Sequence, residues 1–289
     1  MSDEKDILTA LADGMNTFSN GQKRIAGYII EEYDKAAFIT AGRLADVSGV
    51  SESTVVRFAQ ELGYRGYPEM RGALQSVVRG KLTSLQRIHI AREILESGDI
   101  PGKVLQSDIE QIRETLADLN AADFDAVVSK IAGAKNIYII GRRSSGALAH
   151  FMGFYFSLLL PNVRVVSEAS YLEVLEELLR ITTEDVLVAI SFPRYSNRTI
   201  RAMRYARDRG ASVIAVTDSA ESPVAKQSDV ALFARSDMLS FVDTLTAPMS
   251  LVTALIVAVS AKSSVDVYAN FEQLESVWKE YGVYDKPDV

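Results

Sequence analysis

With 289 residues, 48 % of them hydrophobic and 24 % charged, the chain is long enough for two globular domains that each bury a core. It contains no cysteine and only two histidines, which excludes disulfides, cysteine nucleophiles and cysteine- or histidine-rich metal sites, so we expect no metal and no cofactor. The net charge of −7 argues against a protein that coats nucleic acid, although it permits a local contact with phosphate.

No part of the chain is expected to enter a membrane or to direct secretion. The first residues, MSDEKDILTALADG, are acidic and amphipathic instead of basic and then apolar. Among the apolar runs, 148–160 is too short to span a bilayer, while 244–261 contains Pro248 and several threonines and serines. We therefore expect 244–261 to be a buried helix at a domain or subunit interface, in a protein of the reducing cytoplasm.

The first eighty or so residues are predicted to be all helical. A short amphipathic segment near 7–11 precedes a helix over about 21–33, and a break is expected at 34–37. Residues 42–67, GRLADVSGVSESTVVRFAQELGYRGY, then form two short helices joined by a turn at Gly49. The apolar side of the first of these helices is expected to consist of Leu44, Ala45 and Val47.

The second helix of this pair is predicted over about 52–62, with Ser51 as its N-cap. Val55, Phe58, Ala59 and Leu62 recur at helical spacing and form its buried stripe, while the opposite face is polar and includes Gln60. This pattern is typical of a DNA-reading helix-turn-helix, and an ordinary solvated helical hairpin is the alternative. The residues that we expect to contact DNA carry hydrogen-bond donors at these helices and the loop that follows: Arg43, Ser51, Ser53, Thr54, Arg57 and Arg65.

The region after the second helix carries local positive charge. In the loop 63–68, Arg65 is expected to contact phosphate, while Tyr64 and Tyr67 either face the DNA backbone or pack on the helices. From 43 to 92 there are eight basic and four acidic residues, a balance of 8 − 4 = +4 in an acidic chain. Such a segment favours a specific, local contact with phosphate over bulk attraction.

A connector is predicted between two domains. The pattern from 70 to 95 is helical but without a clean apolar face, and 97–102 is rich in glycine and proline. We divide the chain into a helix-turn-helix domain (1–80), a helical connector (81–102) and a second domain (103–289). The second domain begins with a helix pair that carries Leu105, Ile109, Ile112, Leu116 and Leu119 on one face.

After residue 134 short β-branched runs alternate with helical stretches. Strands are predicted at 136–140, 163–166, 185–190, 212–217 and 230–233, with helices at 145–160, 171–181, 197–209 and a short one near 223–226. This alternation predicts βαβ units and therefore an α/β fold with a doubly wound, mainly parallel five-stranded sheet of the flavodoxin-like kind. Ligands of such sheets bind beyond the carboxyl ends of the strands.

Polar loops follow the first and third predicted strands, and each opens a helix. They read GRRSSG at 141–146 and SFPRYSNRT at 191–199. Helix N-termini attract anions, and arginine side chains bind phosphate or carboxylate, so we expect an anion site; serines that merely cap helices are the alternative. The residues that we expect to bind the effector are Arg142, Arg143, Ser144, Ser145, Ser191, Arg194, Ser196 and Thr199.

These segments carry a resemblance to a known family. RLADVSGVSESTVVRFAQELGYRGY resembles the helix-turn-helix of the RpiR/MurR bacterial transcription regulators, and NIYIIGRRSSG and DVLVAISFPRYSNRT are similar to a sugar isomerase (SIS) domain. The resemblance implies a cytoplasmic, carbohydrate-responsive regulator that binds double-stranded operator DNA, senses a phosphosugar or related metabolite, and assembles as a homodimer or homotetramer. Repression of a carbohydrate or related catabolic operon is the expected output.

Two glycines of the usual SIS motifs are replaced in this chain. The motif G-x-G-x-S keeps Gly141 and Ser145 but has Arg143 at the second glycine, and S-x-S-G-x-T keeps Ser191 but has Pro193 and Arg194. Because two arginines replace glycines, we expect an effector more anionic than a simple hexose phosphate, such as a phosphorylated sugar acid or another carboxylate. The alternative function is a sugar-phosphate isomerase with His150 and Glu168 as its acid–base pair, although His150 lies in an apolar run and is expected to pack there.

Overall fold

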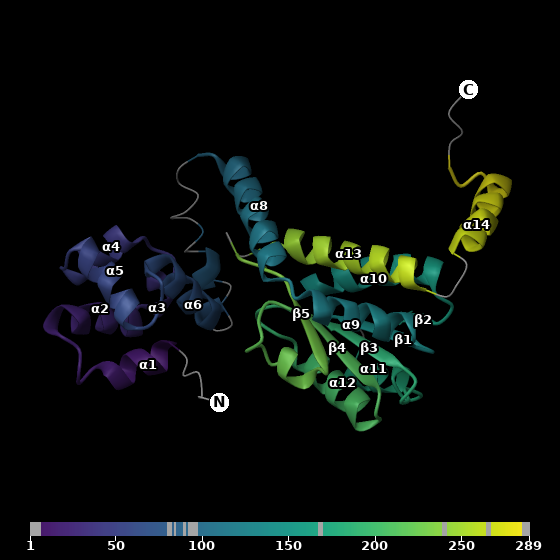
Figure 1. Cartoon of the computed structure of the whole chain (residues 1–289), viewed down its shortest axis with the longest axis horizontal. Helices are drawn as coiled ribbons and strands as arrows, with labels where there is room; N and C mark the ends of the chain where they lie inside the picture. The colour runs from purple at the N-terminus through teal and green to yellow at the C-terminus, as the bar shows by residue number, and fades with distance from the viewer. Residues whose placement is uncertain are drawn as a thin grey trace. The chain divides into compact units, whose positions relative to one another are not determined.

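The computed structural model describes residues 7–79, 83, 85–88, 91, 98–166, 170–238, 242–263 and 267–284 (Figure 1). The chain forms two compact units that divide at Ile100 and Pro101. Half of the predicted connector 81–102 lies outside the described residues.

The first unit is helical, as predicted. Its helices are α1 (Ile7–Gly14), α2 (Asn20–Glu31), α3 (Tyr33–Ala36), α4 (Ala41–Ser48), α5 (Glu52–Glu61) and α6 (Tyr67–Arg79). The predicted break at 34–37 is wrong, because the chain forms the short helix α3 there. The prediction of no clean apolar face after residue 70 is also wrong, since Met70, Leu74 and Val78 of α6 are buried.

The core of this unit holds α4 and α5 together. Phe58 of α5 is buried and meets Phe18 edge to face at 5.1 Å, and Leu44 of α4 is fully buried. Val47 is 40 % exposed, contrary to prediction, because Ser48 is the residue of α4 that turns inward. Leu62 is half-buried and ends the stripe of α5. The helix pair therefore packs as predicted except at Val47.

The second unit is the predicted α/β fold. Its elements are α8 (Ile100–Asp118), α9 (Ala121–Ala132), β1 (Ile137–Gly141), α10 (Ser144–Leu159), β2 (Val163–Val165), α11 (Tyr171–Glu177), β3 (Val186–Ile190), α12 (Asn197–Asp208), β4 (Ser212–Thr217), the 3-10 turn η1 (Ala225–Gln227), β5 (Val230–Phe233), α13 (Thr246–Lys262) and α14 (Val267–Tyr281). The five strands are parallel in the order β2-β1-β3-β4-β5. The sheet therefore runs outward in both directions from the β1–β3 pair.

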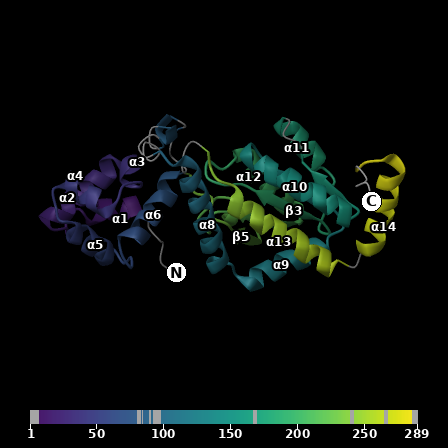
Figure 2. The same ribbon diagram turned by 90° about the horizontal axis from the view of Figure 1, so that it is seen from above.

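Helices cover both faces of this sheet. Helices α9, α10 and α13 lie on one side and α11 and α12 on the other (Figures 1 and 2). Side chains of β1 alternate accordingly, because Ile137 and Ile139 join the first core and Tyr138 and Ile140 the second. Helix α10 approaches the sheet closely, since a Cβ on Gly153 would lie 2.1 Å from a methyl of Val165. The predicted burial of the segment 244–261 is confirmed, because seven residues of α13 are buried.

Within the described ranges, no single helix is both long and apolar enough to cross a membrane. Helices α13 and α14 reach that length only as a pair, and the pair is bent by 109°.

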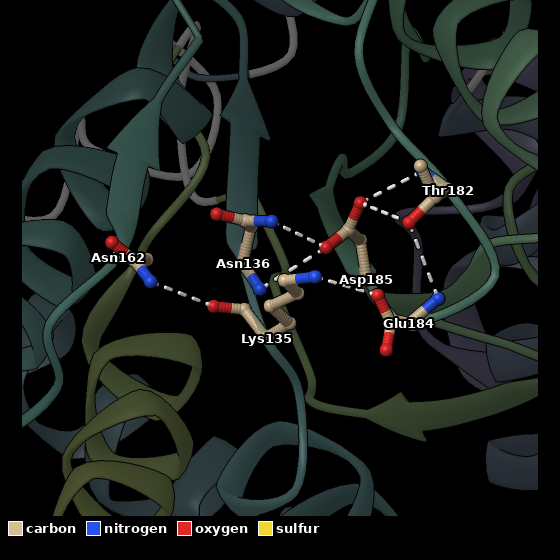
Figure 3. A network of polar contacts seen from close by, with 6 residues as sticks. All are labelled: Lys135, Asn136, Asn162, Thr182, Glu184 and Asp185. Carbon is tan, nitrogen blue, oxygen red and sulfur yellow. Dashed lines mark hydrogen bonds and ion pairs between the residues drawn. The ribbon is translucent and has the colours of Figure 1, made fainter.

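A buried carboxylate ties the amino-terminal ends of β1 and β3 together (Figure 3). Asp185 is 1 % exposed, and its Oδ1 accepts hydrogen bonds from the backbone N–H of Asn136 at 3.1 Å and from its Nδ2 at 2.6 Å. Its Oδ2 accepts from the N–H of Thr182 at 2.7 Å and from its Oγ1 at 2.9 Å. Next to this network lies an exposed ion pair, in which Lys135 Nζ is 2.7 Å from Glu184.

We expect Asp185→Ala to lower the free energy of unfolding of the second unit by about 3 kcal/mol, because it removes a buried carboxylate that accepts four hydrogen bonds. Thermal unfolding followed by circular dichroism measures the loss. Glu184→Ala is the matched control, since an exposed ion pair contributes little to stability. Equal melting temperatures for the two variants would contradict the role assigned to Asp185.

Candidate functional site

The turn between α4 and α5 has the geometry that the sequence predicts. Gly49 adopts φ +62° and ψ +40°, the left-handed conformation that closes a helix, and its N–H bonds back to Ala45 and Asp46. Ser51 caps α5, because its Oγ accepts the N–H of Thr54 at 3.3 Å. The same Oγ lies 2.9 Å from Ser53 Oγ and 2.7 Å from Thr54 Oγ1. Three of the predicted DNA contacts thus form one hydroxyl cluster at the start of α5.

The other predicted DNA contacts lie at the surface of the same helix pair. Arg43 on α4 and Arg57 on α5 are exposed. Arg65 lies in the loop before α6 and is held by Glu69, whose Oε1 is 3.2 Å from Arg65 Nε. The hydrogen bond from the Arg65 backbone N–H lowers the pKa of Glu69, so this carboxylate stays charged beside the arginine.

Tyr67 belongs to the structure of the unit and does not face outward. It is 4 % exposed, and its hydroxyl donates to the carbonyl of Ile39 at 2.9 Å. Burial raises the pKa of Tyr67 to about 12, so the phenol is a neutral donor at neutral pH. Of the two roles considered for this tyrosine, packing is confirmed.

The register of the sheet places the two polar loops of the second unit side by side. Strands β1 and β3 are neighbours, and Gly141, the last residue of β1, pairs with Ile190, the last residue of β3. The loops 142–143 and 191–196 therefore leave adjacent strands at the same level. The sheet turns outward in opposite directions from this pair, which is the position at which open parallel sheets bind ligands.

The loop after β3 orders a series of hydroxyls at the start of α12. Ser191 is buried, and its Oγ accepts the N–H of Ser196 at 3.4 Å. Ser196 caps α12 by accepting the N–H of Thr199 at 3.4 Å. Thr199 is fully buried, and its Oγ1 has no hydrogen-bond partner among the described residues. A buried hydroxyl without a partner costs free energy, so a ligand oxygen at this helix end would stabilise it.

The loop after β1 brings its residues to the same end of the sheet. Ser145 is buried in the first turn of α10, Arg142 is half-buried, and Arg143 and Ser144 are exposed. The close approach of α10 to β1 depends on Gly141, because a Cβ there would lie 2.4 Å from the carbonyl oxygen of Ser145. The structure thus brings all eight predicted effector residues to the ends of β1 and β3.

Both arginines that replace motif glycines have a strained backbone. Among the described residues, Arg143 and Arg194 are the only two other than glycine with positive φ, at +57° and +70°. Such conformations cost roughly 1–3 kcal/mol for a residue with a Cβ, and they persist only where the surrounding structure imposes them. Both loops therefore keep a shape suited to glycine while exposing a guanidinium.

The sequence analysis missed two residues at the same edge of the sheet. Tyr195 donates its hydroxyl to Asp218, at 2.9 and 3.1 Å from the two carboxylate oxygens, and Asp218 directly follows β4. This contact ties the loop after β3 to the loop after β4. The rule that directed attention to the ends of β1 and β3 would have found Asp218 if it had also been applied to β4.

A cavity of about 190 Å³ lies further along this edge, beyond β4 and β5. Its lining consists of Thr115, Asp118, Asp218, Ser219, Ala220, Phe233, Ala234 and Arg235. None of the predicted effector residues lines it. The cavity adjoins the predicted site through Asp218 only.

The structure describes one member of the acid–base pair that the isomerase alternative needs. His150 is exposed on α10, contrary to the expected packing, and its Nδ1 lies 2.8 Å from the carbonyl oxygen of Gly146. Glu168, its proposed partner, lies outside the described residues. Among the residues that are described, no cluster of three or more His, Asp or Glu side chains could hold a metal ion.

Two family models match the chain, one on each unit. Residues 5–79 match the helix-turn-helix domain of the rpiR family, and residues 130–258 match the SIS domain. The chain belongs to the RpiR family of regulators. The predicted resemblance is thereby confirmed for both parts of the chain.

Relatives of similar length match most of the chain. An uncharacterised HTH-type transcriptional regulator of Caldanaerobacter subterraneus is 23 % identical over 279 residues, which are 94 % of this chain and 96 % of that protein. Another, from Clostridium perfringens, is 25 % identical over 229 residues, 78 % of this chain and 80 % of that protein. The RpiR-family chain is accordingly a transcriptional regulator and not an enzyme.

Solved structures share the fold. The sugar isomerase domain of an RpiR transcription factor from Sphaerobacter thermophilus has a TM-score of 0.58 and 25 % identity, over 61 % of this chain and 98 % of that one. The Vibrio vulnificus NanR protein, complexed with ManNAc-6P, has a TM-score of 0.59 and 22 % identity, over 95 % of this chain and 98 % of that one. The predicted fold class is confirmed.

The strain at Arg143 leads to a measurable difference between two substitutions. Arg143→Gly and Arg143→Ala both remove the guanidinium, but only glycine accepts φ +57° at no steric cost. We expect the glycine variant to be more stable than the alanine variant by about 1 kcal/mol, measured by thermal unfolding. A more stable alanine variant would contradict the strained conformation.

Proposed function

We propose that this RpiR-family regulator is a cytoplasmic, homo-oligomeric repressor of a carbohydrate or related catabolic operon that responds to an anionic metabolite. The proposal combines an output surface on the first unit with a ligand site at the ends of β1 and β3. The observation that carries it is the placement of two arginine-bearing loops on adjacent strands, where Gly141 pairs with Ile190. The domain limits 1–80, 81–102 and 103–289 remain part of this proposal.

The DNA contacts divide by chemistry. The face of α5 would enter the major groove, so that Ser53, Thr54 and Arg57 approach base edges. Ser51, Arg43 and Arg65 would position phosphates around it. Their exposure and the capped start of α5 support this assignment. A single small helical module binds weakly, so a symmetric pair of units is needed for a specific operator.

The effector site suits a ligand with more than one negative group. Ser145 and Ser196 lie at two helix N-termini, which favour a phosphate, and Ser191 at the end of β3 is hydrogen-bonded to the second of these termini. Arg143 and Arg194 add two exposed guanidinium groups, which favour a carboxylate or a second phosphate. The NanR structure was solved with ManNAc-6P, a ligand that carries a phosphate, and this supports a phosphorylated metabolite here. A phosphosugar or a phosphorylated sugar acid is the ligand class we propose.

Regulation requires that the effector favours one arrangement of the protein over another. A ligand shifts operator affinity only by its difference in affinity for the two arrangements. We place assembly as a dimer or tetramer on the second unit, through α13 and the helices beside it. Apolar residues on the exposed side of α13, such as Val257 at 62 % exposure, support this location.

Arg57→Ala should weaken operator binding by about 1–3 kcal/mol and blur the preference for one base pair, because a bidentate base contact is lost. Selection of bound sequences from a random DNA pool, followed by titration at fixed salt, measures both effects. Arg65→Ala is the contrasting control. It should weaken all sequences alike and reduce the salt dependence of binding, as expected for a phosphate contact. If Arg57→Ala behaves in the same way, Arg57 contacts the backbone and the assignment is wrong.

The effector proposal is tested with two probes that differ by one carboxylate. We expect 6-phosphogluconate to bind more tightly than glucose 6-phosphate in calorimetric titration, and Arg143→Ala and Arg194→Ala each to weaken the acidic ligand about tenfold. Arg209→Ala, which removes an exposed arginine from the far end of α12, is the matched control and should bind like the parent protein. Tighter binding of glucose 6-phosphate than of 6-phosphogluconate would overturn the preference for a ligand with an additional carboxylate.

A further inference from the structure

Helix α8 turns its polar side toward its own unit. Oxygens of Asp108 accept hydrogen bonds from Thr244 Oγ1 at 2.6 Å and from Thr246 Oγ1 at 2.8 Å. Gln111 Oε1 accepts the N–H of Asp237 at 2.7 Å, and this side chain is 3 % exposed. The polar side of an amphipathic helix normally faces water, so this arrangement is reversed.

Further along, the same side of α8 holds Arg235. Thr115 Oγ1 accepts the backbone N–H of Arg235 at 2.9 Å, and Asp118 lies 2.6 Å from its Nη2. Arg235 Nε is also 3.3 Å from Glu114. These contacts span three turns of the helix and set its rotation about its own axis. The orientation of α8 is therefore imposed by hydrogen bonds and ion pairs.

This rotation leaves an apolar stripe on the outside. The stripe consists of Leu105, Ile109, Ile112 and Leu116, which are 63 %, 44 %, 36 % and 71 % exposed. The sequence pattern predicts that these residues share one face of a helix, and the structure leaves that face at the surface. Leaving four large aliphatic side chains in a row exposed to water is costly, and such a surface marks an interface.

The stripe has the same residue types at the same spacings when it is read in either direction along the helix. Its residues read Leu, Ile, Ile, Leu at spacings of four, three and four, so the pattern is symmetric about the point between Glu110 and Gln111. A second identical helix running in the opposite direction would place its Leu116 against Leu105 and its Ile112 against Ile109. By symmetry, its Leu105 and Ile109 would meet Leu116 and Ile112. That is the self-complementarity that a two-fold interface requires.

We propose that α8 packs antiparallel against α8 of a second copy of the chain, about a two-fold axis between residues 110 and 111. The proposal rests on the symmetric pair that the proposed function needs. Among the helices beside α13 it names α8 as the one that forms the pair, since Asp108 of α8 bonds Thr246 of α13. The charges beside the stripe fit this partner. Glu110 and Arg113 lie on the flank away from the body of the unit, 3.3 Å apart. In the antiparallel pair each Arg113 comes within reach of Glu110 of the second copy.

Cross-linking tests the direction and register of the pair. The chain has no cysteine, so Leu105→Cys and Leu116→Cys each introduce a single thiol. In the antiparallel pair position 105 meets position 116 of the second copy. Two copies of the same position lie 116 − 105 = 11 residues apart along the axis, or about 16 Å, too far for a disulfide.

We expect a rapid disulfide only when the two variants are co-expressed. Trypsin should then yield a linked pair of peptides, one with residue 105 in 104–113 and one with residue 116 in 114–130. Rapid cross-linking within either variant alone would indicate parallel or unspecific pairing and would overturn the proposal. Absence of a disulfide in the co-expressed pair would overturn it as well.

Sedimentation velocity on the full chain separates this proposal from the proposed function. We expect Leu116→Glu to halve the mass of the parent assembly, while Gln106→Glu, which adds the same charge to α8 off the stripe, leaves it unchanged. Circular dichroism checks that both variants are folded. If Leu116→Glu leaves the mass of the assembly unchanged, either another face forms the pair or the chain's own first unit covers the stripe. In both cases the proposed interface is wrong. A monomeric parent chain would overturn the symmetric regulator itself.

Discussion

The pairing of β1 with β3 is the constraint on which the second unit depends. Because Gly141 lies opposite Ile190, two loops separated by fifty residues begin at the same level of the sheet and share one ligand site. At the other end of the same pair, Asp185 joins β3 to the start of β1 and to Thr182, and so holds the register. The buried network and the candidate site are therefore opposite ends of one structural element.

The two strained arginines show how a loop can keep its shape while its chemistry changes. A glycine at φ +57° or +70° lets a phosphate approach the backbone closely and adds nothing else. An arginine in the same conformation costs conformational free energy but adds a permanent positive charge and five N–H donors. Strain of this kind persists where the surrounding structure imposes it, and here Gly141 and the tightly packed start of α10 impose it beside Arg143. At both positions the chain therefore carries a positive charge on a backbone conformation that favours glycine.

Local patterns predicted most of this architecture, whereas facts that depend on packing escaped them. The capped start of α5, the turn at Gly49 and the ends of β4 and β5 follow from residue types at fixed spacings. Periodicity does not tell which of two adjacent residues turns inward. The pattern therefore predicts a buried Val47, whereas Ser48 is the residue that is buried. Nor does periodicity tell what an apolar face will contact, so the pattern on α8 does not reveal that its stripe lies at the surface. The partner of Tyr195 could not be foreseen either, because the order of the strands sets it.

The proposed pairing of α8 also sets the distance between the two copies of Ile100, the residue at which the helix begins. In the proposed antiparallel pair the first residue of α8, Ile100, lies opposite position 121 of the other copy. The two Ile100 residues are then 121 − 100 = 21 residues apart along the helix axis, which is about 32 Å. Successive major grooves on one side of B-DNA are about 34 Å apart. The division between the units falls at Ile100 and Pro101, so the proposed interface would fix the separation of the two points at which the chains pass from one unit to the other. A symmetric contact on this helix therefore constrains the ends of the two connectors as well as the assembly.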